Sequence, residues 1–79
     1  MMGQRVDPDR YGFLRLPEGG FGRDIGGRWW VRPPSANMVR LNGHEVEEHP
    51  GGAITVRPSI EVAERGAAFR LENGRWRRL

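Results

Sequence analysis

The residue types most often used for metal binding occur together only between His44 and His49. This segment reads His-Glu-Val-Glu-Glu-His, one residue longer than the HExxH helix of zinc proteases. On a helix, residues five apart lie about 140° apart around the axis, and on a strand they lie on opposite faces. Neither geometry lets the two histidines share a metal ion. We therefore expect an ordinary charged strand, with no metal site and no cofactor.

Other groups that catalysis could use do not converge on one place. The three glutamates of this segment are not arranged around a pocket by any pattern in the sequence, and no serine lies in a nucleophile-elbow context. The glycine-rich stretch 17–27 lacks the Gly-Lys-Ser/Thr ending of a phosphate-binding P-loop. No set of acid, base, nucleophile and metal ligand can be named, so we do not expect an enzyme.

The arginines near the end of the chain form the first candidate binding site. Asn73-Gly74 separates two β-type runs, and a two-residue turn there places Arg70 opposite Arg77, with Arg75 on the same face. Like charges directly opposite each other repel, and a bound anion such as phosphate would relieve the repulsion. The alternative is a solvated arginine face. All 13 basic residues are arginine, which fits phosphate recognition and equally fits a GC-rich genome.

Two adjacent tryptophans give the second candidate. Trp29 and Trp30 point to opposite faces of a strand, so only one of them can be fully buried. An exposed tryptophan is typical of a protein-binding surface, and Trp30 is our candidate protein contact. The alternative is that the glycine-rich stretch covers it.

These candidates need strands to position them, and the chain is rich in strand signals. Residues 10–16 and 28–32 have β-type composition, and Asn42-Gly43 predicts a hairpin that joins 38–41 to 44–47. Apolar and polar residues alternate strictly from Ile54 to Val62, which is typical of a half-buried strand. Pro58 cannot donate a ladder hydrogen bond, so this strand is either bent there or lies at an edge.

The sequence thus predicts an all-β domain, built as a small antiparallel sheet or barrel with two Asn-Gly hairpins. With 79 residues, one domain over 1–79 is expected, with 1–9 flexible and 17–27 a glycine-rich loop. The core residues we expect are Phe13, Trp29, Val31, Val39, Leu41, Val46, Ile54, Val56, Ile60, Val62, Phe69, Leu71 and Trp76.

Three features that are absent from the sequence bear on disulfides, membrane insertion and secretion. There is no cysteine, which excludes disulfides and thiolate metal sites. No apolar run approaches the ~18 residues of a membrane-spanning helix, and residues 1–7 lack the apolar core of a signal peptide. We expect neither membrane insertion nor secretion by that route.

The second half of the chain resembles a family of short phage and prophage proteins of unknown function. The matching residues lie within about 28–78: Trp30 with Pro33-Pro34, the stretch from His49 to Ile60 that contains Ile-Thr-Val-Arg-Pro-Ser-Ile, and the closing hairpin from Phe69 to Trp76. The resemblance implies a setting in the cytoplasm of a bacterial host cell. It implies no activity, because the family has none assigned.

Two functions follow as hypotheses. The first is a small binding protein that engages a protein partner through Trp30 or exposed sheet edges, which would also permit self-association. The second is a nucleic-acid-binding module that uses Arg70, Arg75 and Arg77. Phosphate contacts weaken steeply as salt rises, whereas an apolar protein interface does not.

Overall fold

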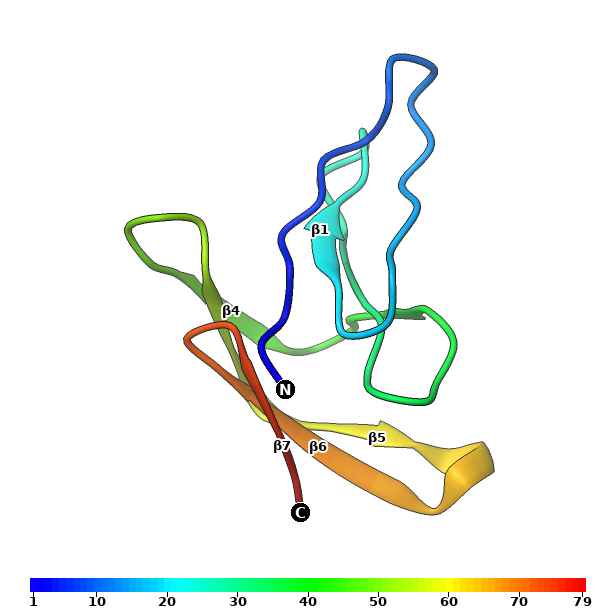
Figure 1. Cartoon of the computed structure of the whole chain (residues 1–79), viewed down its shortest axis with the longest axis vertical. Coiled ribbons are helices and arrows are strands. Elements are labelled where there is room, and N and C mark those ends of the chain that lie inside the picture. The colour runs from blue at the N-terminus through cyan, green and yellow to red at the C-terminus, as the bar shows by residue number, and fades with distance from the viewer.

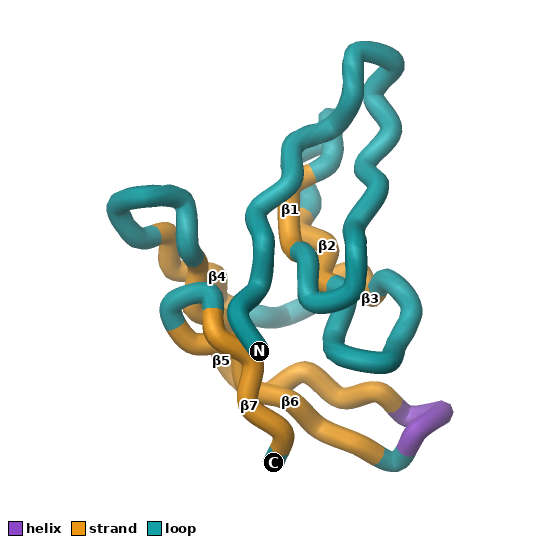
Figure 2. Tube along the Cα trace, viewed as in Figure 1, coloured by secondary structure: helices purple, strands orange, loops and turns teal.

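The computed structural model describes all 79 residues and consists of two antiparallel sheets, which residues 41–44 connect along the chain (Figures 1 and 2). The first sheet has the order β1 (Phe21–Arg23), β2 (Trp29–Val31) and β3 (Val39–Arg40). The second has the order β4 (Glu45–Glu48), β5 (Ile54–Val62), β6 (Ala67–Glu72) and β7 (Arg75–Arg78), with a 3-10 turn η1 (Ala63–Arg65) between β5 and β6. The predicted all-β class is confirmed, in the form of two sheets and not a closed barrel.

The C-terminal Asn-Gly hairpin forms with the predicted register. Asn73 and Gly74 have φ of 47° and 78°, the positive values that a type I′ turn needs at both central positions. Glu72 therefore pairs with Arg75, and Leu71 pairs with Trp76.

The prediction of a second hairpin, at Asn42-Gly43, is wrong. Strand β3 pairs with β2 and strand β4 pairs with β5, so this dipeptide crosses from one sheet to the other. Only Gly43 has a positive φ, +75°. Each half of the expected hairpin instead pairs with a strand that is already in the core, which gives more apolar contact than an isolated two-stranded hairpin offers.

Strand β5 is a central strand with a bend at Pro58. Its apolar positions on either side of the bend are buried, whereas Pro58 itself is exposed. The register with β6 shifts between Val56 and Ile60. Strand β4 pairs with β5 only as far as Arg57, so Pro58 lies both at the register shift and where β5 has no partner on its β4 side.

The N-terminal region differs from our expectation. Residues 10–16 form no strand, and the first residues, which we expected to be flexible, are hydrogen-bonded to both sheets. The amide of Gly3 donates to the Gly74 carbonyl (2.6 Å), and the amide of Phe21 donates to the Gln4 carbonyl (3.0 Å). The segment therefore links β7 to β1, and Figure 1 shows it running between the two sheets.

The glycine-rich stretch 17–27 is not an open loop, because it contains β1. Phe21 is only 2% exposed, and a Cβ at Gly22 would collide with the Val6 carbonyl. Glycine is required there because two backbone segments approach closely. From composition alone, a glycine needed for close approach cannot be distinguished from a glycine in a flexible loop.

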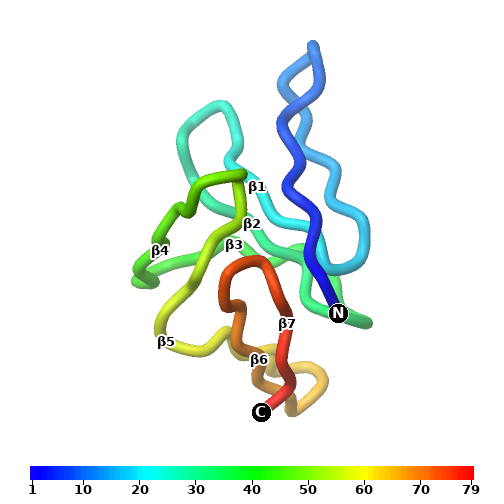
Figure 3. Tube along the Cα trace, turned by 60° about the vertical axis from the view of Figure 1, so that its left-hand side comes forward, coloured from blue at the N-terminus to red at the C-terminus, as the bar shows by residue number.

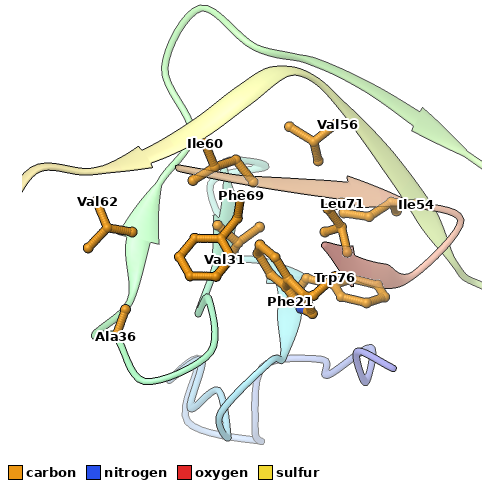
Figure 4. Close-up of a cluster of buried hydrophobic side chains, with 10 residues drawn as sticks. All are labelled: Phe21, Val31, Ala36, Ile54, Val56, Ile60, Val62, Phe69, Leu71 and Trp76. Atoms are coloured by element: carbon orange, nitrogen blue, oxygen red, sulfur yellow. The ribbon is translucent and has the colours of Figure 1, made fainter. Parts of the chain in front are cut away.

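One buried cluster joins the two sheets (Figure 4). Its members are Phe21, Val31, Ala36, Ile54, Val56, Ile60, Val62, Phe69, Leu71 and Trp76. The expected core is confirmed over most of this set, and Trp29, Val39, Leu41 and Val46 pack against it while partly exposed. The prediction that Phe13 belongs to the core is wrong, because its side chain is 60% exposed.

Candidate binding surfaces

A projecting turn at residues 9–13 carries side chains that the core does not use. The Asp9 carboxylate accepts hydrogen bonds from the amides of Tyr11 (2.9 Å) and Phe13 (3.0 Å), and the Asp9 amide donates to the Phe13 carbonyl (2.9 Å). In Figures 1 and 3 this turn lies at the far end of the molecule from the C-terminus. These bonds hold the turn in one conformation, so the aromatic side chains that flank Gly12 are displayed on a defined backbone.

Three large apolar side chains are exposed at this end of the molecule. The exposed fractions of Tyr11, Phe13 and Ile25 are 69%, 60% and 81%. Ile25 belongs to the turn between β1 and β2, and its Cδ1 lies 3.3 Å from the position that a Cβ on Gly12 would occupy. We call Tyr11, Phe13 and Ile25 the tip surface.

Two arginines lie beside the aromatic rings of the tip surface. The Arg10 guanidinium lies 4.9 Å from the centre of the Tyr11 ring and donates to its hydroxyl (2.7 Å). The Arg15 guanidinium lies 5.9 Å from the centre of the Phe13 ring. Such pairs keep cations beside apolar surface, a combination that binding interfaces use often.

Asp24 holds the turn that presents Ile25. Its carboxylate accepts hydrogen bonds from the Trp30 indole N–H and from the amides of Gly26 and Arg28, each at 2.9 Å. The Trp30 indole is half-buried, and its one polar group is used inside the chain. Trp30 therefore helps to hold the turn that carries Ile25, through its hydrogen bond to Asp24. A direct contact between Trp30 and a partner stays a prediction.

The same hydrogen bonds lower the pKa of Asp24 below its ordinary value of 3.8, with the Trp30 indole as the largest cause. A lowered pKa in the folded state means that the carboxylate stabilises the fold above pH 3.8, and that this contribution is lost as the pH falls through the folded pKa. We expect Asp24→Asn to melt at a lower temperature than the parent at pH 7, and the difference to shrink below pH 3.8. Thermal melts from pH 7 to pH 2 measure this; a difference that stays constant over that range would contradict it.

The three arginines of the predicted site lie as the hairpin register implies, and their binding of an anion stays a prediction. Arg70 pairs with Arg77 across the ladder, and Arg75 pairs with Glu72. All three arginines are exposed on the side of the sheet away from the core. Arg70 has a carboxylate partner, Glu72, at 3.7 Å, whereas no carboxylate lies within 4.0 Å of Arg75 or Arg77.

The two histidines of the His44–His49 segment have separate partners. The ring nitrogens of His44 face the carbonyls of Asn42 (3.1 Å) and Ser59 (3.3 Å). The Nε2 of His49 lies 2.7 Å from the Thr55 hydroxyl. Each imidazole therefore takes part in a local structural contact.

The tip surface is the part that our sequence analysis missed. Tyr11 and Phe13 alternate with other residues as in a strand, and this pattern led us to place Phe13 in the core. The usable signal was the pair Asp9 and Gly12, because aspartate at the start of a turn bonds to backbone amides two or more residues on, and Gly12 has a φ of +85°.

No family model, curated protein or solved structure matches this chain. No helix in it has both the length and the apolar character needed to cross a membrane.

Proposed function

We propose that this chain is a small binding protein that engages a protein partner through the tip surface. The observation that carries the proposal is the exposure of Tyr11, Phe13 and Ile25 together on two hydrogen-bonded turns. A single exposed apolar residue is ordinary on a protein surface. Three on two turns that meet where Ile25 approaches Gly12, with arginines beside the aromatic rings, are typical of a binding hot spot.

The rigidity of the two turns supports the same proposal. Asp9 and Asp24 each accept hydrogen bonds from two amides of their own turn, so little conformational freedom remains to be lost when a partner binds. The matching partner has an apolar pocket for the two aromatic rings, with carboxylates at its rim for Arg10 and Arg15.

Sheet edges are a weaker candidate for this contact. Strand β4 carries Glu45, Glu47 and Glu48 at the edge of its sheet, and charged residues at an edge oppose the pairing of strands. The other edge strand of this sheet, β7, is covered by the first residues of the chain, because the Trp76 amide donates to the Met1 carbonyl (2.8 Å). Self-association through edges stays a prediction, and the tip surface is the better site for a partner.

The resemblance to short phage and prophage proteins gives this proposal a setting. Within it, the partner is a phage or bacterial protein in the cytoplasm of the host cell. The exposed tip surface supports binding as its role.

The test compares a variant in which Tyr11, Phe13 and Ile25 are all serine with a control, Leu79→Ser. Leu79 is also exposed (61%) but lies outside the tip surface. Each protein is immobilised and incubated with bacterial host lysate, the retained proteins are quantified by mass spectrometry, and the Kd of the purified partner is then measured. We expect the control to bind like the parent and the tip variant to lose at least 2 kcal/mol, about 30-fold in Kd.

Both variants are expected to melt within a few degrees of the parent, because the replaced side chains are exposed. A partner retained equally by the parent and the tip variant would overturn the proposal, as would the absence of any protein that the parent retains and the tip variant does not.

A further inference from the structure

We propose that the face of the β4–β7 sheet that points away from the core binds the phosphates of nucleic acid through a row of three arginines, Arg57, Arg70 and Arg77. This site is independent of the tip surface. It includes Arg57, which no sequence pattern placed beside the other two.

The bend in β5 builds the row. Val56 pairs with Leu71 and Ile60 pairs with Phe69, so residues 57–59 together face the single residue Arg70. Arg70 in turn pairs directly with Arg77. Since adjacent strands lie about 4.8 Å apart, the three side chains begin in line across β5, β6 and β7, all of them exposed.

The row borders two hollows on this face. The first, of about 540 Å³, lies at the bend, and Arg57, Ser59 and Arg70 are among the residues that line it. The second, of about 490 Å³, is lined by Arg75 and Arg77. A hollow lets several guanidinium groups reach one phosphate, and guanidinium is the group best matched to phosphate oxygens.

The charges around the hollows favour an anion. Four arginines and a single carboxylate, Glu72, line the two hollows. Two of the arginines have glutamate partners: Arg57 with Glu47 at 3.3 Å and Arg70 with Glu72 at 3.7 Å. These pairs are exposed, and exposed ion pairs contribute little, so a phosphate can replace the carboxylates.

The lining favours nucleic acid over a protein partner. Val56, the one large apolar residue lining the first hollow, is 1% exposed, so no large apolar side chain there is available to anchor a protein partner. A line of arginines across three strands matches a polymer that repeats its phosphates, and contacts of this kind do not depend on base sequence.

The experiment measures the fluorescence anisotropy of labelled DNA, one probe being a single-stranded oligothymidylate and the other a duplex, from 50 to 200 mM salt. Three phosphate contacts predict a slope of log K against log salt of about −2 for the single strand and about −2.7 for the duplex. Affinity then falls about 15-fold and about 40-fold over that range.

Two sets of variants identify the site. Replacing Arg57, Arg70 and Arg77 by alanine is expected to abolish the binding and its salt dependence. The control replaces Arg28, Arg40 and Arg65, three exposed arginines elsewhere with no carboxylate within 4.0 Å, and it removes the same number of positive charges. Glu72→Gln is expected to tighten binding, because it removes the one carboxylate that lines both hollows.

No binding of either probe at 50 mM salt would overturn this proposal. So would an equal loss of affinity in the two triple-alanine variants, since that would mean attraction by net charge alone. The tip variant should bind DNA like the parent, so that failure of the tip proposal and failure of this one can be told apart.

Discussion

Replacing Trp76 by alanine is expected to lower the free energy of unfolding by about 3–5 kcal/mol. Trp76 is 4% exposed, and its ring meets that of Phe69 edge to face, with centroids 6.0 Å apart. Its indole N–H donates to the Gly19 carbonyl at 2.7 Å, a buried contact between β7 and the segment that leads into β1. The substitution therefore removes core volume and leaves a buried carbonyl without its donor.

Chemical denaturation followed by circular dichroism measures this loss. Trp76→Phe is the matched variant, because it keeps an aromatic ring and removes the donor; we expect it to cost about 1–3 kcal/mol. A Trp76→Ala loss below that of Trp76→Phe would contradict the packing described for this residue.

Valine in place of Gly74 should destabilise far more than valine in place of Gly43. Both glycines have a positive φ, +78° and +75°, which a β-branched residue resists at a cost of about 1–2 kcal/mol. Gly74 is also buried in the hairpin turn, and its added Cβ would lie 3.2 Å from the Ala53 Cβ, whereas nothing lies within 4 Å at Gly43. Overpacking adds about 1–3 kcal/mol at Gly74 only.

The same denaturation measurement gives both values, and Gly43→Val serves as the control for backbone strain alone. Equal losses at the two positions would mean that Gly74 does not occupy the crowded turn described here.

Strand β5 and the β6–β7 hairpin could be predicted from sequence because their signals are local. Alternation from Ile54 to Val62 and the two-residue turn at Asn73-Gly74 each act within a few residues. The missing donor of Pro58 limits the strand there to a bend or an edge. The N-terminal half depends on contacts between distant segments. Position 22 needs glycine because the Val6 backbone lies against it, and no local sequence pattern predicts this contact.

The candidate sites follow the same division. Arg70 and Arg77 face each other because one hairpin sets their register. Arg57 joins them only through the register shift between β5 and β6, which a sequence pattern does not specify. Tyr11 and Phe13 had the spacing of a strand, and the Asp9 carboxylate instead folds them into a turn.

Site-specific photo-crosslinking tests the central claim, that the tip surface binds a protein, most directly. The chain has no cysteine, so Tyr11→Cys and Leu79→Cys each provide one thiol for a benzophenone label. We expect the label at position 11 to crosslink to a distinct protein in host lysate and the label at position 79 not to do so. Crosslinking at position 79 with none at position 11, or the same products from both, would contradict the account.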